Sequence, residues 1–338
     1  MKIAIIGLGY WGPNLVRNFI TTEGVDGVVC WDLQPKKMER IKKRFPSVET
    51  VETLEEILTD PEIAGVAVAT PVSTHHEIGM KVLGAGKHLL LEKPMAASSR
   101  EARELVEAAS KKGVVLAVDH TFIYTGAVRK IKELLESGKI GEILYFDSVR
   151  VNLGLFQHDA NVVWDLATHD LSIMHHLIGM RPVGVSAVGV SHFNGHEDMA
   201  YLTVHFSDKL LAHFHVNWLS PVKVRKILIG GSRQMVVYDD MEASDKVKVY
   251  DKGVSVNGEE SVYRALVQYR TGDMFAPHLD QTEALTLLAR EFVDCIQNGK
   301  PPAVDGMAGL EVVQILEAAD LSMKNGGEKI LLSTLSEA

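Results

Sequence analysis

The sequence predicts an α/β protein, in which a doubly wound parallel sheet is followed by an α+β domain with an open, mostly antiparallel sheet. Short apolar runs alternate with helical patterns through the first 120 residues, and a glycine-rich turn directly follows the first run. From Glu142 onward the runs are longer and alternate apolar with polar residues. We therefore expect two domains, residues 1–122 and 123–338.

The first element is a strand over residues 2–6 that leads into Gly7-x-Gly9-x-x-Gly12 and then a helix. Gly7 permits a tight turn, Gly9 lets backbone N–H groups approach a pyrophosphate, and Gly12 lets the helix pack close to the strand. Pro13 suits the first turn of that helix. The spacing alone is a weak signal, but a strand before it and a helix after it indicate a phosphate-binding turn.

Asp32 closes the second apolar run, twenty residues beyond Gly12. A dinucleotide-binding fold places an acid there, where its carboxylate accepts hydrogen bonds from the adenosine ribose hydroxyls and repels a 2′-phosphate. This position predicts NAD rather than NADP, although Lys36 and Lys37 leave some NADP use open. The alternative is that Asp32 only ends a strand.

The remaining elements follow the same two patterns, strands alternating with helices in the first domain and longer strands in the second. In the first domain we expect strands over 27–31, 65–69, 88–91 and 114–118, and helices over 13–21, 36–45, 53–59, 75–84 and 99–111. In the second domain we expect strands over 142–153, 183–191, 199–207, 210–218, 224–230, 233–239 and 246–250, and helices over 163–178, 281–298 and 307–324. The last helix is a candidate for packing back on the first domain, and the free sheet face is a candidate oligomer contact.

The composition is that of an ordinary globular protein, with 46% hydrophobic and 23% charged residues in a chain of 338. A net charge of −9 argues against nucleic acid and anionic membranes as partners. The two cysteines, Cys30 and Cys295, lie far apart in apolar contexts, which predicts reduced thiols. With no leader sequence and no membrane-length apolar run visible, we expect a cytoplasmic protein.

Glu92 and Lys93 end the buried strand that begins at His88, and Pro94 follows them. Ligands of a doubly wound sheet lie outside the carboxyl ends of its strands. A lysine there could hydrogen-bond a substrate hydroxyl and stabilise the alkoxide that develops as hydride leaves. The alternative is an ion pair in solvent at the end of a strand.

Asp165 and His169 are four residues apart, which places them on one face of a helix. The carboxylate can then orient the imidazole, and an imidazole is a suitable general base for alcohol oxidation. The histidine patterns elsewhere lack a metal-binding signature, since His175-His176, His213-x-His215 and His76-Glu77 have neither an HExxH motif nor paired cysteines. We therefore expect no catalytic metal.

The motifs occur in an order that resembles the glucose-fructose oxidoreductase / inositol dehydrogenase (Gfo/Idh/MocA) family over nearly the whole chain. They are the glycine turn with Asp32, the run Ala69-Thr70-Pro71 with His76, the segment from Gly86 to Pro94, and Asp165-x-x-x-His169-Asp170. The resemblance implies a Rossmann domain, a second domain with an open antiparallel sheet, and NAD(P)-dependent oxidation or reduction of a sugar or cyclitol. It also implies homo-dimers or homo-tetramers formed through that sheet.

The resemblance assigns roles to individual residues. His169 matches the acid/base, Asp165 its partner, and Lys93 the residue that assists at the substrate oxygen. The cofactor-binding positions match Gly7, Gly9, Tyr10, Trp11, Gly12, Asp32, Thr70, Pro71, Ser73, His76, Glu92 and Lys93. Asp119-His120-Thr121-Phe122 departs from many relatives, which carry an asparagine and an arginine there, so substrate contacts of that segment are not transferred.

Residues 119–124 and 161–170 resemble members that act on nucleotide sugars, several of them 3-dehydrogenases of UDP-N-acetylglucosamine or its uronate. A nucleotide diphosphate needs cations, and Arg150, Lys223 and Arg225 lie on expected strands of the second domain, where a solvent-facing position is the alternative. The residues that could hydrogen-bond sugar hydroxyls are Tyr124, Asn152 and Asn161.

These observations lead to an NAD-dependent dehydrogenase that oxidises a secondary hydroxyl, with C3 of a UDP-N-acetylhexosamine favoured. The alternatives are an oxidoreductase of a free sugar or cyclitol and an NAD-dependent, redox-assisted glycosidase. A regulator that binds NAD only as a sensor is a further alternative, against which Lys93, Asp165 and His169 count.

Overall fold

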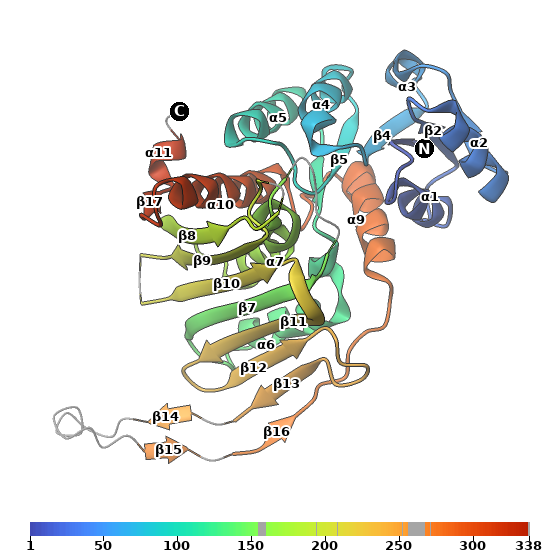
Figure 1. The fold of residues 1–338 in the computed structure, drawn as a ribbon. Helices are drawn as coiled ribbons and strands as arrows, with labels where there is room; N and C mark the ends of the chain where they lie inside the picture. The colour runs from blue at the N-terminus through green and yellow to red at the C-terminus, as the bar shows by residue number, and fades with distance from the viewer. Residues whose placement is uncertain are drawn as a thin grey trace. The chain divides into compact units, whose positions relative to one another are not determined.

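A computed structural model describes residues 1–154, 160–193, 195–207, 209–251, 253–255, 268–270 and 272–336. The chain forms two compact units (Figure 1). The first unit contains Met1–Tyr124 and Thr282–Gln314, and the second contains Thr125–Gln281 and Ile315–Ala338. The chain therefore leaves the first unit after Tyr124, builds most of the second, returns once to the first and ends in the second.

The first unit is built on a six-stranded parallel sheet with the order β3-β2-β1-β4-β5-β6. The strands are β1 (Lys2–Ile6), β2 (Gly27–Trp31), β3 (Glu49–Thr50), β4 (Ile63–Val68), β5 (His88–Glu92) and β6 (Leu116–Asp119). The strand order reverses between β1 and β4, and ligands of such sheets bind at this point of reversal. The predicted doubly wound parallel sheet is confirmed.

Helices alternate with these strands as the sequence predicts. They are α1 (Gly12–Ile20), α2 (Pro35–Arg44), α3 (Leu54–Thr59), α4 (His75–Gly84) and α5 (Ser99–Lys112), with short 3₁₀ turns η1 (Val72–Thr74) and η2 (Thr121–Tyr124). Thr53 and Glu56 form a capping box at α3, and the Ser98 hydroxyl accepts from Glu101 N at α5. Gly113 ends α5 with a φ of 65°.

Two late helices contribute to the first unit, although both were expected within the range 123–338, with the last of them a candidate for packing back on the first domain. They are α9 (Ala284–Asn298) and the first half of α10 (Gly306–Lys324). Phe292 of α9 packs edge-on against Phe19 of α1, with ring centroids 6.2 Å apart. The domain boundary is thus discontinuous in sequence, because apolar side chains nearly 300 residues apart complete one core.

The second unit is built on a nine-stranded sheet with the order β16-β13-β12-β11-β7-β10-β9-β8-β17. Its strands are β7 (Ile143–Leu153), β8 (Gly184–Val190), β9 (Met199–His205), β10 (Leu211–Asn217), β11 (Leu219–Gly231), β12 (Met235–Asp239), β13 (Val247–Tyr250), β16 (Met274–Phe275) and β17 (Ile330–Leu331). Neighbours are antiparallel except β7 and β10, which are parallel. Strands β14 (Gly253–Ser255) and β15 (Gln268–Arg270) pair antiparallel in a separate two-stranded sheet.

Among the described residues of the second unit, two helices were not expected from the sequence, α6 (Gly126–Glu136) and the four-residue α11 (Ser333–Ser336). Helix α6 begins where the Thr125 hydroxyl accepts from Val128 N, and it buries Ala127, Val128, Ile131 and Leu134. Its first residue is glycine for a steric reason, since a Cβ there would lie 2.0 Å from the carbonyl oxygen of Asp280. The expected helix over 163–178 is divided into a π-helical turn, η3 (Val163–Ala167), and α7 (Thr168–Ile178).

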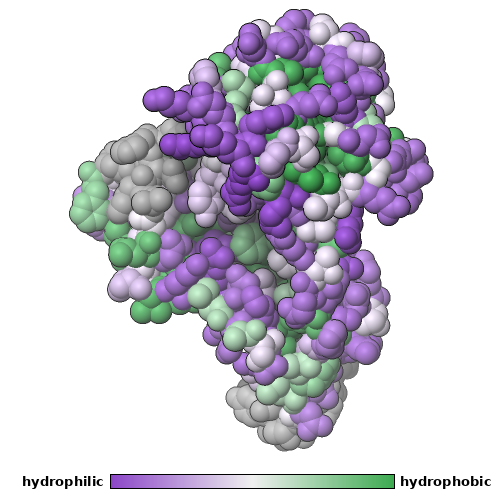
Figure 2. All heavy atoms as spheres, turned by 90° about the vertical axis from the view of Figure 1, so that its right-hand side faces the viewer, coloured by the Kyte–Doolittle hydropathy of each residue, from purple (hydrophilic) through white to green (hydrophobic). Residues whose placement is uncertain are grey.

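The side chains of the long strands face two different environments. One face of β7 buries Phe146, Ser148 and Arg150, whereas Tyr145 and Leu153 are exposed. Hydrophilic residues cover most of the molecular face drawn in Figure 2, with apolar residues exposed in separate patches. Within the described residues, no helix is long and apolar enough to cross a membrane.

Candidate active site

The glycine turn between β1 and α1 is shaped for a phosphate group. Gly7 has a φ of +92°, and a Cβ on it would lie 2.6 Å from the carbonyl oxygen of Ala69. A Cβ on Gly12 would lie 2.1 Å from the carbonyl oxygen of Gly7, whereas a Cβ on Gly9 would meet nothing within 4 Å. The space above Gly9 is therefore open, and no side chain caps the N-terminus of α1. Both features fit the pyrophosphate of a dinucleotide.

Asp32 follows β2 and is held from three directions. Its carboxylate accepts from Leu8 N at 2.7 Å, from Gln34 N at 2.9 Å and from Lys37 Nζ at 3.2 Å. These bonds fix the acid beside the glycine turn, as the prediction of a ribose contact requires. The ion pair with Lys37 also offsets part of the negative charge that would repel a 2′-phosphate.

Three apolar side chains around this turn are exposed to an unusual degree. Tyr10 is 84% exposed, Trp11 43% and Leu33 83%. Tyr10 and Trp11 belong to the turn itself and Leu33 directly follows Asp32, so all three flank the place that the pyrophosphate and ribose fit. Apolar area of this kind is expected where a ligand covers it. Leu33 was not among the predicted site residues, because nothing in its local pattern marks it.

The loop after β4 carries Thr70, Pro71 and Ser73, and the imidazole of His75, which was not among the predicted site residues, anchors it. The ring nitrogens of His75 lie 3.0 Å from the carbonyl oxygen of Pro94 and 2.8 Å from that of Thr70. Burial lowers the pKa of His75, and the two carbonyl contacts oppose this effect. His76 instead pairs with Glu104 of α5 at 2.7 Å. From the sequence alone, two adjacent histidines do not show which of them turns toward the loop and which turns toward α5.

Glu92, Lys93 and Pro94 lie at the carboxyl end of β5, as the sequence predicts. Glu92 is buried, Lys93 is partly exposed, and the Lys93–Pro94 peptide bond is cis. His75 joins the carbonyls of Pro94 and Thr70, so the loop after β4 and the segment after β5 form one connected rim. This rim and the glycine turn are the candidate cofactor side of the active site.

In the second unit, Asp165 and His169 lie where η3 passes into α7, and both are partly exposed. The carboxylate of Asp165 accepts a hydrogen bond of 3.0 Å from Nε1 of Trp218, the residue that follows β10. Trp218 is fully buried, and a Cβ on Gly154 would lie 2.7 Å from its ring. The sequence analysis did not select Trp218, since no motif connects it with a helix 53 positions away.

Arg150 is enclosed by the second unit. Its side chain is 3% exposed, and its guanidinium donates to both carboxylate oxygens of Asp170, at 3.0 and 2.6 Å. The Ser148 hydroxyl donates to the same carboxylate at 2.7 Å. This buried pair joins β7 to the first turn of α7, which carries His169. Because both donors point at Asp170, we propose no direct contact between Arg150 and a substrate.

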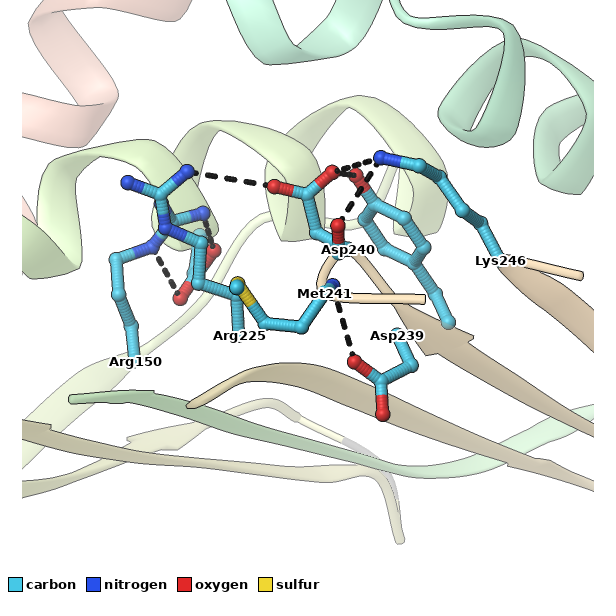
Figure 3. Close-up of polar contacts among 8 residues, drawn as sticks. Arg150, Arg225, Asp239, Asp240, Met241 and Lys246 are labelled. Atoms are coloured by element: carbon cyan, nitrogen blue, oxygen red, sulfur yellow. Dashed lines mark hydrogen bonds and ion pairs between the residues drawn. The ribbon is translucent and has the colours of Figure 1, made fainter. Parts of the chain in front are cut away.

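Arg225 also has a carboxylate partner. Its guanidinium lies 3.3 Å from Asp240, which Lys246 contacts at 2.9 Å and to which the Tyr238 hydroxyl donates at 3.2 Å (Figure 3). Burial alone would raise the pKa of Asp240, but Lys246 and Arg225 hold that pKa below its ordinary value. Lys223, in contrast, is exposed on β11. Of the cations proposed for a diphosphate, Lys223 is therefore the one that faces solvent.

Two residues expected to contact sugar hydroxyls have internal partners. The Tyr124 hydroxyl donates to the Glu291 carboxylate of α9, and burial raises its pKa well above the ordinary value. Asn161 caps η3 with its side-chain oxygen and donates to Glu197 at 3.1 Å and Asp320 at 2.9 Å. Asn152 is half-buried on β7. The internal bonds give Tyr124 and Asn161 structural roles, so we propose no substrate contact for either.

In the described part of the chain, no group of three or more histidine, cysteine or acidic residues could hold a metal ion. The chemistry available there is that of a lysine on the nucleotide-binding unit and a carboxylate–histidine pair on the other. Such groups can bind a hydroxyl and accept its proton, and a dinucleotide provides the acceptor for hydride. Fold and site therefore define a dinucleotide-dependent oxidoreductase of two domains.

Comparison with family models agrees with this class and makes it specific. Residues 1–120 match the model described as "Oxidoreductase family, NAD-binding Rossmann fold", and residues 132–332 match "Oxidoreductase family, C-terminal alpha/beta domain". The chain belongs to the Gfo/Idh/MocA family. It is an NAD(P)-dependent oxidoreductase of the sugar or cyclitol type with an NAD-binding Rossmann domain, as its motifs predict.

Relatives with different substrates cover nearly the whole chain. The scyllo-inositol 2-dehydrogenase (NADP(+)) IolW of Bacillus subtilis is 28% identical over 96% of this chain and 94% of its own. The UDP-N-acetylglucosamine 3-dehydrogenase of Acidithiobacillus ferrooxidans is 24% identical over 93% of this chain and 94% of its own. A crystal structure of the latter enzyme, GnnA, has a TM-score of 0.82 at 22% identity and covers 96% of this chain and 98% of its own. That likeness confirms the fold.

Proposed function

We propose that the protein is an NAD-dependent dehydrogenase that oxidises a secondary hydroxyl of a sugar, with C3 of a UDP-N-acetylhexosamine as the favoured position. The observation that carries the proposal is the presence of two groups of residues, one on each unit. A cradle for a dinucleotide with Lys93 at its rim lies on the first unit, and Asp165 and His169 lie on the second. The relative named UDP-N-acetylglucosamine 3-dehydrogenase supports the choice of substrate.

Each residue then has a defined task. The turn from Gly7 to Gly12 binds the pyrophosphate, and Asp32 binds the ribose. His169 accepts the proton of the reacting hydroxyl, and Asp165, held by Trp218, orients the imidazole. Lys93 hydrogen-bonds the same oxygen and stabilises the charge that develops on it. NAD, when bound, supplies the acceptor for the hydride that leaves the sugar carbon.

An inositol or another free cyclitol is the second candidate substrate. The 28% identical relative named scyllo-inositol 2-dehydrogenase (NADP(+)) favours this choice. The pairing of Arg150 with Asp170 and of Arg225 with Asp240 favours it as well, since two of the three cations proposed for a diphosphate have internal partners. A neutral cyclitol needs no such cations. Lys223 is the described residue of that set that could still serve a diphosphate.

We also propose that the protein is a homo-dimer or homo-tetramer associated through the nine-stranded sheet. The face of the sheet that carries Tyr145 exposes other apolar side chains, among them Leu153, Val188, Val190, Tyr201 and Leu211. Apolar area spread over neighbouring strands is typical of a self-association surface. For the site of action we propose a reducing compartment, the cytoplasm, because Cys30 and Cys295 are buried free thiols.

The decisive experiment offers the purified protein NAD with a panel of UDP-sugars and inositols, each with and without 2-oxoglutarate. NADH is followed by absorbance and the sugar by mass. The proposal expects a UDP-N-acetylhexosamine to lose two hydrogen atoms. Reduction of NAD by inositols alone would select the second candidate. The arm with 2-oxoglutarate detects an enzyme that retains the cofactor and recycles it, in which free NADH does not accumulate.

A further inference from the structure

Two acidic side chains are buried side by side at the carboxyl ends of β5 and β6. Glu92 and Asp119 are register partners on these parallel neighbours, so their side chains leave the same face of the sheet. Glu92 is 8% exposed and Asp119 1%. A buried carboxylate is costly unless its charge has a partner. Two of them in contact are more costly still, because their charges repel in a medium of low dielectric constant.

The hydrogen bonds of the pair are incomplete if both groups are ionised. Glu92 Oε2 accepts from Lys93 N at 3.3 Å, and Asp119 Oδ1 accepts from the Thr121 hydroxyl at 2.6 Å. The second oxygen of each group, Glu92 Oε1 and Asp119 Oδ2, is buried. Neither accepts a hydrogen bond from any donor in the described part of the chain. Register pairing places the two carboxyl groups beside each other at neighbouring strand ends. One proton between them supplies the missing donor.

We propose that Glu92 and Asp119 hold one proton at neutral pH, with the proton on Glu92 and the negative charge on Asp119, and that this single charge keeps the Lys93 ammonium charged at the rim of the site. The assignment follows from the donors. Asp119 has the Thr121 hydroxyl to stabilise its charge, whereas Glu92 has one long bond from a backbone N–H. Glu92 and Asp119 are thus positioning residues that act through Lys93.

The titration behaviour of the two groups agrees with this assignment. Burial, followed by the charge of Asp119, raises the pKa of Glu92 well above its ordinary value. Burial also raises the pKa of Asp119, while Thr121 and the Glu92 proton oppose that rise. The charge of Lys93 lowers the pKa of both carboxyls. The other titratable groups around the pair are His120, which is buried beside Asp119, and Tyr124, whose hydroxyl donates to Glu291.

The consequence for the site is electrostatic. A doubly ionised pair would place two negative charges beside Lys93 and draw its ammonium onto the carboxylates, away from a substrate oxygen. A fully protonated pair would leave the ammonium without a counter-charge and favour its neutral form. One proton and one charge avoid both outcomes. This inference rests on the proposed function, in which Lys93 holds the substrate oxygen.

The first test is infrared spectroscopy of the protein at neutral pH. A protonated carboxyl has a C=O stretch that a carboxylate lacks, so the wild type should show this band and Glu92→Gln should lose it. Asp320 is the matched control, because burial also raises its pKa, and Asp320→Asn should leave the Glu92 band in place. If the wild-type protein shows the band assigned to Glu92 only at acidic pH, the proposal is overturned.

The second test measures the pKa of Lys93 by NMR after reductive methylation with ¹³C-formaldehyde, with Lys93→Arg used to assign the signal. Glu92→Gln keeps a neutral hydrogen-bond donor beside Asp119, so the Lys93 pKa should stay within roughly 0.5 of the wild-type value. Glu92→Gln combined with Asp119→Asn removes the charge, so that pKa should fall by about 1 to 3 units.

The alternatives give different patterns in the same series. A doubly ionised pair predicts a fall in the Lys93 pKa already in Glu92→Gln, and an uncharged pair predicts no fall even in the double variant. Either pattern overturns the proposal. Neither measurement uses turnover, so a failure here is separate from a failure of the proposed function, which substitution of Lys93 itself tests by loss of activity.

Discussion

The two units hold their proposed functional residues in different ways. In the first unit, the binding elements are the backbone turn from Gly7 to Gly12 and Asp32, which accepts from Gln34 N two positions on and from Leu8 N of that turn. In the second unit, contacts from distant segments fix the reactive groups. Trp218 holds Asp165, and Arg150 of β7 holds Asp170 of α7. The nucleotide-binding residues therefore depend mainly on one backbone turn and the strand end beside it, whereas Asp165 and Asp170 depend on side chains from distant strands.

Among the substitutions that test this difference between the units, loss of Lys93 should lower turnover the most. Lys93→Met removes the proposed hydrogen bond to the reacting oxygen, so we expect turnover to fall by about 10²- to 10⁴-fold. NAD affinity should stay nearly unchanged, because the glycine turn and Asp32 are intact. Stopped-flow turnover and NAD titration by fluorescence measure the two quantities. Lys81→Met is the control, since Lys81 is exposed and paired with Glu77. Full turnover in Lys93→Met would remove the residue from the mechanism.

Loss of the donor to Asp165 should have the next largest effect. Trp218→Phe keeps the aromatic ring and removes the N–H, and a hydrogen bond to a charged group contributes about 1.5–3 kcal/mol. We expect kcat to fall about tenfold to a hundredfold, with a shifted pH profile of kcat and unchanged NAD affinity. The matched control is Trp164→Phe, which removes a 2.8 Å bond to Asp320 on the same unit. Equal pH profiles in both variants would reduce Trp218 to a packing role.

In the first unit, the pair Asp32 and Lys37 should set the choice of cofactor. Asp32→Ala should raise the KM for NAD by about tenfold and weaken the preference for NAD over NADP, because it removes both the ribose acceptor and the charge that repels a 2′-phosphate. Lys37→Ala frees that charge and should strengthen the preference. Steady-state kinetics with NAD and with NADP measures both the KM for NAD and the preference between the two cofactors. An NAD/NADP ratio that neither variant changes would exclude Asp32 as the selecting residue.

A smaller effect concerns the stability of the second unit in acid. Burial, with the charge of Lys132, lowers the pKa of His176 to about 4, against about 6.5 in an unfolded chain. Below the unfolded value, the unfolded chain binds a proton that the folded protein excludes, so stability is lost as the pH falls from about 6.5 to about 4.

His176→Gln should therefore make the urea midpoint of the second unit less dependent on pH within that window. His278→Gln, at an exposed position, is the control and should leave the dependence as it is. An unchanged dependence in His176→Gln would contradict the assignment. The NAD-binding unit, monitored by its ligand-induced fluorescence, should not respond to either variant.

Three of the residues expected to contact substrate have partners inside their own unit, Tyr124 in the first and Arg150 and Asn161 in the second. Arg150, Tyr124 and Asn161 are polar residues of suitable chemistry, and each engages an internal partner instead: Asp170, Glu291 and Asp320. Alternation along a strand shows that a residue faces one side of the sheet, but it does not show which side a helix covers. Asp170 of α7 receives the guanidinium of Arg150, so this helix occupies the side of β7 on which Arg150 lies.

The sequence by itself determined the doubly wound sheet, the glycine turn, the position of Asp32, and Lys93 at the end of β5. These features depend on backbone conformation and on residues a few positions apart, and such interactions leave a periodic or spaced pattern in one dimension. Only the tertiary structure showed that α9 completes the first core, that His75 anchors the rim, that Trp218 holds Asp165, and that Glu92 meets Asp119. Those pairings depend on which distant segments the core brings together, and burial then decides the charge each group can carry.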